Sequence, residues 1–318
     1  MSEKTITLVV PCYNEEGTIP VFYGTVKEVL DSDCDIDYRI LFVNDGSTDH
    51  TLEEMKKLST LDSRVQYVSF SRNFGKEAAL FAGLCNAEGD YVGVMDVDLQ
   101  DPPSLIPEMI SALESGEYDC AAARRADRKG EPKVRSFFAR CFYRLSNKIS
   151  DVNLVEGARD FRIMKREMVD AVISLSENNR FSKGLFEWVG FRTKWLSYDN
   201  VERSAGKTKW SFFKLLKYSM DGIASFSEFP LLLSSFAGIL SMAAAFIMLL
   251  FVFFRRLIFG DPVAGWASTI CIILFISGLQ FMIMGIMGQY IAKTYIESKN
   301  RPHYIITETN CEKCDKIK

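Results

Sequence analysis

"YVGVMDVDLQDPP", residues 91–103, passes from an apolar run into two aspartates one residue apart, a glutamine, a third aspartate and two prolines. The apolar run predicts a buried strand, so the polar residues follow at its carboxyl end. Asp96, Asp98 and Gln100 offer oxygen donors at alternate positions, a set that suits Mg²⁺ or Mn²⁺ and not zinc. Such an ion completes its shell with substrate phosphates, which implies a diphosphate ligand. Acid/base catalysis and turn formation are the other common uses of such a carboxylate pair.

Four further runs rich in apolar and β-branched residues lie in the first 125 residues, separated by stretches long enough for helices. These runs are residues 6–10, 38–43, 65–70 and 118–122. The alternation predicts an α/β fold, with a mainly parallel sheet and helices on both faces. Ligands of such sheets bind beyond the carboxyl ends of the strands. The chain has no GxGxxG after its first strand and no GxxxxGK[ST], which argues against dinucleotide and P-loop sites.

The first three of these predicted strands also end in polar motifs. The motifs are PCYNEE at residues 11–16, NDGSTD at 44–49 and SRNFGK at 71–76. The second motif also reads as a turn that caps a helix, which explains Ser47 or Asp49 better than Asp45. We therefore expect several strand ends to contribute side chains to one ligand site.

Two long apolar stretches follow Pro230. Residues 231–254 carry no charge over 24 residues, and residues 266–291 have only Gln280 and Gln289 as strongly polar interruptions. Each exceeds the ~20 residues that a helix needs to cross a bilayer. The pair predicts a two-helix transmembrane hairpin, with a buried hairpin of a soluble protein as the alternative.

Basic residues flank this hairpin unevenly. The short loop between the two stretches holds only Arg255 and Arg256. The outer flanks hold Arg203, Lys207, Lys209, Lys214, Lys217, Lys293, Lys299 and Arg301. By the positive-inside bias, we expect a multi-pass protein of the inner (cytoplasmic) membrane with its catalytic domain and both termini in the cytoplasm. The net charge of −3 gives no reason to expect nucleic acid as a partner.

Two amphipathic segments predict helices at the membrane surface, or helices that pack on the soluble domain. They are residues 133–149 and 209–226. The expected organisation has four parts. These are a cytoplasmic domain at 1–202, a basic loop with an interfacial helix at 203–229, two transmembrane helices within 230–292, and a solvated cytoplasmic tail at 293–318.

The ordered motifs together resemble a family 2 glycosyltransferase with the GT-A (Rossmann-like) fold. They are residues 10–15, 43–49, 71–76 and 96–103. Within that family the chain is similar to polyprenyl-phosphate glycosyltransferases, the bactoprenol glucosyltransferases and dolichyl-phosphate mannose synthases. The resemblance covers nearly the whole chain, including the hairpin.

The resemblance implies a role for each matching residue. Residues that line the nucleotide would be Pro11, Tyr13, Glu15, Asp45, Lys76 and Asp96. The metal ligands would be Asp96, Asp98 and Gln100, and the catalytic residues Asp98 and Asp160. Groups that bind the donor phosphates or the acceptor would be Arg124, Arg128, Arg203 and Lys209.

The implied reaction is inverting, metal-dependent transfer of one sugar from a nucleotide-sugar to a polyprenyl (undecaprenyl) phosphate. UDP-glucose and UDP-N-acetylglucosamine are the foremost donors, with GDP-sugars open. A phosphate monoester, whose second pKa is about 6, is already mostly ionised at pH 7, so Asp160 need not remove a proton. The two roles open to Asp160 are therefore orienting the acceptor or its phosphate and acting as a base. The chain lacks the QxxRW of processive synthases, which argues for single transfer.

Two alternatives to this reaction stay open. The first is a hydroxyl acceptor on a glycan or glycerolipid, and the second is a non-catalytic membrane protein that binds sugar nucleotides. Assembly into a homo-oligomer is also open, because Gly278, Gly285 and Gly288 permit close helix packing.

Overall fold

A computed structural model describes most of the chain in two compact units. The described residues are 4–34, 36–126, 147, 155–175, 177–198, 229–259 and 266–312. One unit comprises Met1–Gly222 together with Arg301–Lys318, and the other comprises Ile223–Asn300. The two segments expected at the membrane surface, residues 133–149 and 209–226, lie outside the described residues apart from Asn147, and the basic loop beginning at Arg203 lies wholly outside them.

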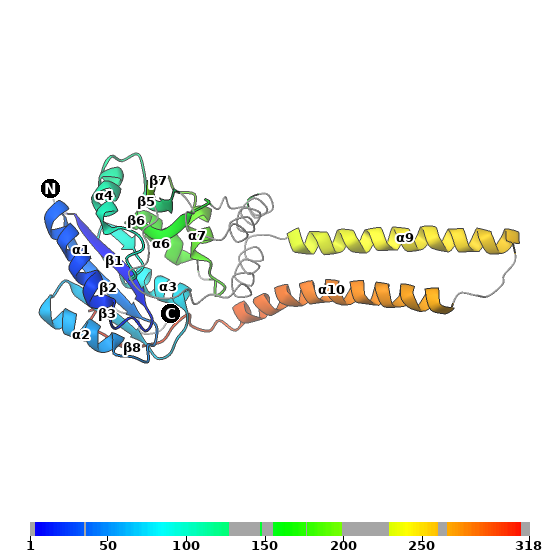
Figure 1. Ribbon diagram of the computed structural model, residues 1–318, viewed down its shortest axis with the longest axis horizontal. Coiled ribbons are helices and arrows are strands. Elements are labelled where there is room, and N and C mark those ends of the chain that lie inside the picture. The colour runs from blue at the N-terminus through cyan, green and yellow to red at the C-terminus, as the bar shows by residue number, and fades with distance from the viewer. Residues whose placement is uncertain are drawn as a thin grey trace. The chain divides into compact units, whose positions relative to one another are not determined.

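The first unit is built on one sheet, to which the described residues contribute eight strands (Figure 1). The strands are β1 (Thr5–Cys12), β2 (Asp37–Asn44), β3 (Val65–Phe70), β4 (Tyr91–Val94), β5 (Cys120–Arg125), β6 (Ala158–Lys165), β7 (Thr193–Tyr198) and β8 (Ile306–Thr309). Their order across the sheet is β7-β5-β6-β4-β1-β2-β3-β8. The five strands expected from the apolar runs are confirmed as β1 to β5.

The sheet is mixed. β4, β1, β2 and β3 run parallel, and β5 runs parallel to β7. β6 lies between β4 and β5 and is antiparallel to both, while β8 is antiparallel to β3. Antiparallel β6 brings the sequence after residue 155 alongside β4, so Asp160 reaches the sheet edge that carries Asp96.

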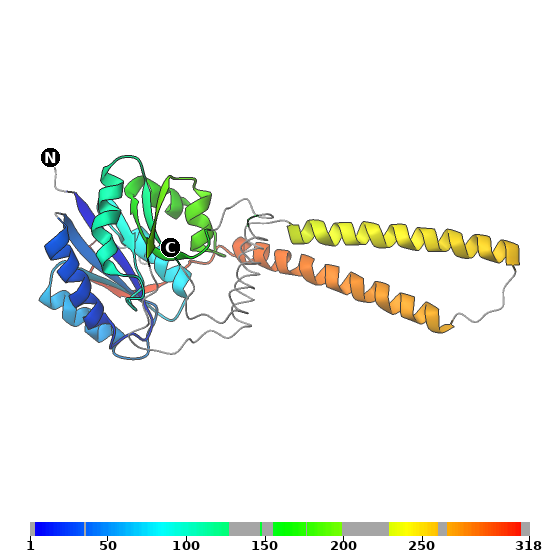
Figure 2. The same ribbon diagram turned by 45° about the horizontal axis from the view of Figure 1, so that its top comes forward.

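Helices cover both faces of the sheet, as expected (Figure 2). They are α1 (Ile19–Asp33), α2 (Thr51–Leu61), α3 (Lys76–Asn86), the 3₁₀ turn η1 (Pro103–Leu105), α4 (Ile106–Glu114), α6 (Arg166–Ser174) and α7 (Ser182–Trp188). Strand residues alternate between two cores, because successive side chains of a strand point to opposite faces. α1, α2 and α4 pack on the face that carries Leu8 and Phe42, whereas α3, α6 and α7 pack on the face that carries Val9 and Leu41.

The chain after the hairpin returns to this sheet, which corrects the expectation of a solvated tail at 293–318. Tyr304 is fully buried, and its ring stacks on Phe70 with a centroid distance of 5.2 Å. β8 then pairs with β3. The tail looks polar in sequence because most of it is, and the short apolar segment around Tyr304 is enough to bury it against an open strand edge.

The second unit contains α9 (Phe229–Phe259) and α10 (Trp266–Ser298), which cover the two predicted apolar stretches. Many large apolar side chains on both helices are exposed, among them Phe236, Phe246, Phe275 and Phe281 at 62–74%. Within the described residues, Phe275–Ser298 is long and apolar enough to cross a membrane, and Ser234–Met248 forms a shorter apolar stretch. The two expected helices are therefore present.

Candidate functional site

The Asp-x-Asp motif begins at the carboxyl end of β4, where the strand leaves the sheet. The backbone N–H of Met95 still donates to the Val9 carbonyl at 3.0 Å, and the chain then turns. Leu99 adopts a φ of 54°, a left-handed conformation that costs a non-glycine residue about 1–2 kcal/mol. Its side chain packs against the apolar core, which holds this turn in place. The turn sets the positions of Asp98 and Gln100.

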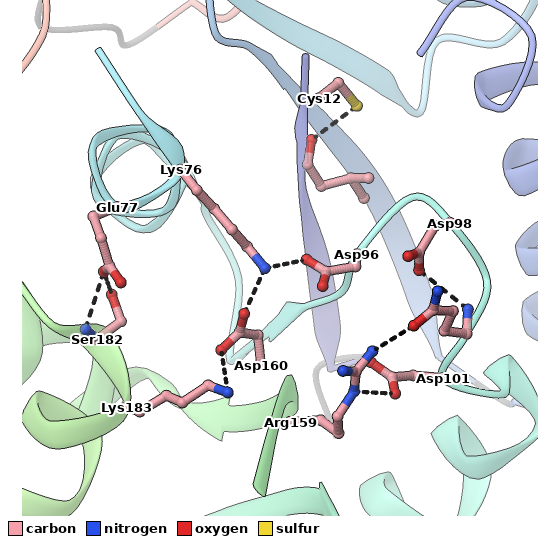
Figure 3. A network of polar contacts seen from close by, with 12 residues as sticks. Cys12, Lys76, Glu77, Asp96, Asp98, Asp101, Arg159, Asp160, Ser182 and Lys183 are labelled. Atoms are coloured by element: carbon pink, nitrogen blue, oxygen red, sulfur yellow. Dashed lines mark hydrogen bonds and ion pairs between the residues drawn. The ribbon is translucent and has the colours of Figure 1, made fainter. Parts of the chain in front are cut away.

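Lys76, the first residue of α3, joins two of the predicted site carboxylates (Figure 3). Its ammonium group lies 2.6 Å from Asp96 Oδ1 and 2.5 Å from Asp160 Oδ2. Lys183, on α7, lies 3.9 Å from the other oxygen of Asp160. Residues 76, 96 and 160, which are far apart in the sequence, thus form one cluster at the carboxyl edge of the sheet.

Within the cluster, the pKa values of Asp96 and Asp160 shift in opposite directions. Burial raises the pKa of Asp96, against the opposing attraction of Lys76. Burial would also raise the pKa of Asp160, but the ammonium groups of Lys183 and Lys76 outweigh it and hold that pKa well below its usual range. Lys76 keeps its proton, because the two carboxylates outweigh the effect of burial and raise its pKa. Asp160 is therefore an ionised carboxylate with two cationic partners and a weak base.

Gln100 is held by arginines and not by the carboxylate cluster. Its side-chain oxygen accepts hydrogen bonds from Arg125 at 3.0 Å and from Arg159 at 3.3 Å. Metal ligation by this oxygen would require it to leave both guanidinium groups, because a carbonyl that faces two cations is a poor partner for a third. Its role as a third metal ligand stays a prediction.

Asp101 is a buried carboxylate, and turn formation alone does not account for it. It is 1% exposed and accepts hydrogen bonds from Arg159 Nε at 2.8 Å and from the Tyr198 hydroxyl. Burial and this hydrogen bond raise the pKa of Tyr198 to about 12. The carboxylate ties β7 to the segment that carries the motif, and it aims Arg159 toward Gln100.

The predicted nucleotide residues divide into two groups. Tyr13 is 43% exposed and lines a cavity at the strand ends. Asp45, in contrast, is buried and accepts hydrogen bonds from the backbone N–H groups of Phe74 at 2.7 Å and Gly75 at 3.0 Å. Burial raises the pKa of Asp45, although these hydrogen bonds oppose the shift. In this structure Asp45 orders the loop that leads into α3.

Glu15 and Pro11 also lie at the end of β1. The Glu15 carboxylate accepts a hydrogen bond from the Thr18 hydroxyl at 2.8 Å, and the Glu15 backbone carbonyl accepts the N–H of Ile19, the first residue of α1, at 3.1 Å. Pro11 is a half-buried residue of β1. Neither lines the cavity that Tyr13 lines, and their nucleotide contacts stay predictions.

The cavity at the ends of β1, β2 and β3 has a volume of ≈ 530 Å³. It is lined by Tyr13, Asn44, Gly46, Ser47, Thr48, Leu52, Ser69, Phe70, Ser71, Arg72, Asn73 and Thr307. One wall is tightly packed: Gly46 has a φ of +63°, and a Cβ there would lie 2.3 Å from the Arg72 carbonyl carbon. Glycine at this position allows the loops after β2 and β3 to meet.

The predicted phosphate-binding residues are placed only in part. Arg124, at the end of β5, is exposed and donates to Ser197 at 2.8 Å. Its neighbour Arg125 instead reaches Gln100, because adjacent side chains of a strand point to opposite faces. Arg128, Arg203 and Lys209 lie outside the described residues.

Asp96 and Asp98 are the two carboxylates of the motif that could hold a hard divalent cation. Within the described part of the chain, no group of three His, Cys, Asp or Glu side chains is gathered as a metal site. Asp98 accepts a hydrogen bond from the N–H of Gln100 at 3.2 Å, which leaves acceptor capacity on its carboxylate. Asp96 already has a cation beside it in Lys76. An oxygen-only pair suits an ion that draws its remaining ligands from water and phosphate.

Sequence reasoning missed Arg125, Arg159 and Lys183. The signal for Arg125 and Arg159 lay in strand alternation, since each is next to a residue that was singled out and points to the other face. Lys183 gave no such signal, because α7 was not expected and the helix reaches Asp160 only through the fold.

Comparison with known proteins gives the family. The model of glycosyl transferase family 2 matches residues 7–173. The putative glycosyltransferase CsbB of Bacillus subtilis is 44% identical over 310 residues, which cover 98% of this chain and 93% of that protein. The prophage bactoprenol glucosyl transferase homolog of Escherichia coli is 43% identical over 95% of this chain and 98% of its own length.

Among solved structures, a glucosyl-3-phosphoglycerate synthase from Mycobacterium tuberculosis aligns with a TM-score of 0.48 and 22% identity, over 70% of this chain and 78% of that one. The family assignment does not depend on it. The family model spans more than half of the 318 residues, and the curated relatives match nearly end to end. The chain therefore belongs to glycosyltransferase family 2.

Proposed function

We propose that this glycosyltransferase transfers one sugar, with inversion, from a nucleotide-sugar to a polyprenyl phosphate at the membrane. UDP-glucose and UDP-N-acetylglucosamine are the proposed donors, and undecaprenyl phosphate is the proposed acceptor. The product is a lipid-phosphate-sugar that other enzymes of the cell envelope would consume. The observation that carries the proposal is the cluster of Asp96, Lys76 and Asp160 at the carboxyl edge of the sheet, the edge that also carries the cavity.

The donor fits along the carboxyl edge of the sheet. Neighbouring strands lie about 4.8 Å apart, so β1, β2 and β3 lie roughly 5, 10 and 15 Å from β4. The cavity over their ends is therefore within reach of a ligand that also contacts Asp96, at the end of β4. A nucleoside in the cavity would extend its diphosphate toward Asp96 and Asp98. Arg125 and Arg159, which meet at Gln100, add positive charge on the far side of these carboxylates.

Asp96 and Asp98 are the residues that would hold Mg²⁺ or Mn²⁺. When bound, such an ion neutralises charge that develops on the departing nucleotide diphosphate. The protein groups then have to orient the donor, exclude water and keep their charges fixed. Lys76, whose ammonium group lies between two carboxylates, supplies a fixed positive charge at this point.

Asp160 acts on the acceptor side as an orienting group. Its carboxylate holds Lys76 and Lys183, and these ammonium groups suit a phosphate. A phosphate acceptor is already ionised at neutral pH and attacks the anomeric carbon without losing a proton. A weakly basic Asp160 suits such an acceptor and does not suit a hydroxyl, which needs a general base.

The way the chain closes its sheet supports a membrane anchor made of two helices. Strands before and after α9 and α10 belong to the same sheet, since β8 pairs with β3. An odd number of crossings between them would leave β8 and β3 on opposite sides of the bilayer, so the number must be even. Two crossings, by α9 and α10, match their exposed apolar side chains. The charge bias then favours the cytoplasmic side for the catalytic unit.

The names of relatives support a prenyl carrier as acceptor. Proteins called bactoprenol glucosyl transferases from Shigella phages SfII and SfV are 43% and 44% identical to this chain over 96% and 95% of its length. Similarity at this level covers both the catalytic unit and the helix pair. It supports a lipid-phosphate acceptor and leaves the sugar to experiment.

A donor screen tests the proposal. Full-length protein in detergent is incubated with Mn²⁺ and with UDP-glucose, UDP-N-acetylglucosamine or GDP-mannose in turn. Each reaction receives undecaprenyl phosphate or undecaprenol, and the lipid products are identified by mass spectrometry. We expect one hexosyl or N-acetylhexosaminyl phosphate lipid, formed only with the phosphate acceptor and lost with EDTA. Transfer to the alcohol alone, or no transfer from any donor, would overturn the proposed acceptor or activity.

A further inference from the structure

The end of the chain forms part of the strand-end cavity. Thr307, on β8, lines this cavity together with residues from the ends of β1, β2 and β3. Only residues 299–305 connect α10 to β8. The cavity wall therefore includes a residue that lies beyond the entire membrane hairpin in the sequence.

β8 is irregular at the position of Thr307. Ser69 pairs with Glu308, and Phe70 pairs with Ile306, so the register shifts and Thr307 has no partner residue in the ladder. A β-bulge of this kind redirects a side chain, and bulges are common beside active sites. Thr307 is exposed although Ile306 before it is buried. Its side chain is thus presented to the cavity.

The bulge is held rigidly from three sides. The Thr307 hydroxyl donates to the Ser69 carbonyl at 3.1 Å, and the N–H of Ser71 donates to the Ile305 carbonyl at 3.0 Å. Tyr304 stacks on the ring of Phe70, and Phe70 is one of the residues that line the cavity. Because Ser69, Phe70 and Ser71 all line the cavity, these contacts tie β8 and the segment before it to the part of the lining that follows β3.

The lining suits the nucleoside part of a nucleotide. Hydroxyl and amide side chains predominate among the described residues around the cavity, with one exposed ring, Tyr13, and one cation, Arg72, and with no carboxylate. Such a mixture offers one aromatic surface and neutral hydrogen-bond partners for a base and a ribose. The volume of ≈ 530 Å³ lies in the range usual for small-molecule sites.

We infer that Thr307 is a positioning residue for the nucleoside of the donor, and that β8 completes the donor pocket. This inference rests on the proposed nucleotide-sugar activity. Thr307 shapes the wall against which the base or ribose lies and touches no reacting atom. Its substitution by a large side chain should therefore weaken nucleotide binding and raise KM for the donor, with little change in kcat.

Thr309 provides a matched control on the same strand. Its hydroxyl donates to the Tyr67 carbonyl at 2.8 Å, the same kind of hydrogen bond that Thr307 makes to Ser69. Thr309 is in register with Val68 and does not line the cavity. A purely structural role for the two threonines predicts similar effects at both positions.

The experiment compares Thr307→Trp with Thr309→Trp in the full-length protein in detergent. Binding of UDP in the presence of Mn²⁺ is measured by isothermal titration calorimetry, and thermal unfolding checks that each variant is folded. We expect Thr307→Trp to weaken UDP binding at least tenfold and Thr309→Trp to change it less than twofold. Thr307→Leu and Thr309→Leu make the same comparison if a tryptophan variant does not fold.

The outcomes separate this inference from the proposed function. Equal UDP affinity of the two folded variants would overturn the role of Thr307 while the proposed activity stands. Failure of the parent to bind UDP, GDP or UDP-glucose would overturn the proposed activity, and the inference with it. A fall in kcat without a rise in donor KM would also contradict a role in nucleoside positioning.

Discussion

Lys76 sets the charge balance of the site. The cluster pairs one ammonium group at short range with Asp96 and Asp160, and Lys183 adds a more distant one. Buried charges persist only when they are paired, so each member depends on the others. The pKa of Asp160 is lowered, against the effect of its burial, because both Lys183 and Lys76 lie beside it, whereas at Asp96 burial outweighs Lys76 and raises the pKa.

Asp98 offers the clearest test of the metal site. Its carboxylate makes no salt bridge within the described residues, so Asp98→Asn should remove metal binding with little structural cost. We expect Mn²⁺ affinity, measured by electron paramagnetic resonance, to fall at least tenfold and sugar transfer to fall about 10²- to 10³-fold. Asp170→Asn, on the exposed side of α6, is the control. Unchanged Mn²⁺ affinity would remove Asp98 from the metal site.

Asp160 tests the role of the acceptor-side carboxylate. The pKa of Asp160 is lowered, so the group stays ionised above its ordinary pKa and should contribute no titration between pH 5.5 and 8. We expect Asp160→Asn to lower kcat/KM by about 10- to 100-fold, because Lys76 and Lys183 lose their common partner. The pH profile of kcat/KM, measured for parent and variant, should keep its shape.

Either of two results would contradict this role for Asp160. Full activity of Asp160→Asn would exclude it from the site. An acidic limb that is present in the parent and absent from the variant would identify Asp160 as a proton acceptor. The orienting role requires lower activity at every pH.

At the scale of elements, loops after neighbouring strands build the site together. Arg124 and Arg125 are adjacent at the end of β5, and their side chains point to opposite faces of the sheet. Only Arg125 of these two therefore contacts Gln100 in the Asp-x-Asp-x-Gln motif. Buried Asp45 and Asp101 act in the same way on two different loops: each carboxylate fixes a neighbouring segment. The loops that carry the exposed functional groups thus depend on buried carboxylates, and the predicted contact of Asp45 with the nucleotide stays a prediction.

Gly46 tests the packing between the loops after β2 and β3. A Cβ at Gly46 would strain a backbone with φ +63° and collide with the Arg72 backbone, whereas Gly116 has φ +75° with no atom within 4 Å. Gly46→Ala should therefore destabilise the protein by about 2–4 kcal/mol and weaken UDP binding, and Gly116→Ala by only about 1 kcal/mol with binding unchanged. Thermal unfolding and calorimetric UDP titration measure both effects. Equal behaviour of the two variants would contradict the role of loop packing.

At the scale of the molecule, the hairpin is inserted into the catalytic unit and does not simply follow it. The sheet begins with β1 and is completed only by β8, beyond α10 (Figure 1). The helices α9 and α10 are therefore bracketed in the sequence by parts of one folded unit.

Tyr304 tests how strongly the chain end stabilises the catalytic unit. Its side chain is fully buried between Phe70 and Phe81, with centroid distances of 5.2 Å and 6.2 Å. Tyr304→Ala should lower the free energy of unfolding by about 3–5 kcal/mol, whereas Ile305→Ala, at a residue 40% exposed, should change it little. Denaturant unfolding followed by circular dichroism measures the difference. Equal stability of parent and Tyr304→Ala would show that β8 is dispensable.

Much of the fold was readable from the sequence alone. The five strands β1 to β5, the flanking helices and the two apolar helices all follow from hydrophobic periodicity, which is a local property of the chain. The strand-end motifs likewise located Asp96 and Asp98 and supported the family resemblance, which in turn singled out Asp160. Local patterns are sufficient for these motifs because each one directly follows the apolar run that forms its strand.

Only the tertiary structure decided which of these residues meet. Lys183 reaches Asp160, Arg125 reaches the motif in place of Arg124, and Thr307 reaches a cavity built mainly from residues 13–73. β8 is short and β6 has charged residues in its first half, so neither shows a clear apolar pattern. Both strands are stabilised by pairing with strands from other parts of the chain, and local periodicity does not reveal such pairing. The sequence thus determined the elements and the chemistry that they carry. Long-range pairing, which depends on edges formed elsewhere in the chain, determined the site.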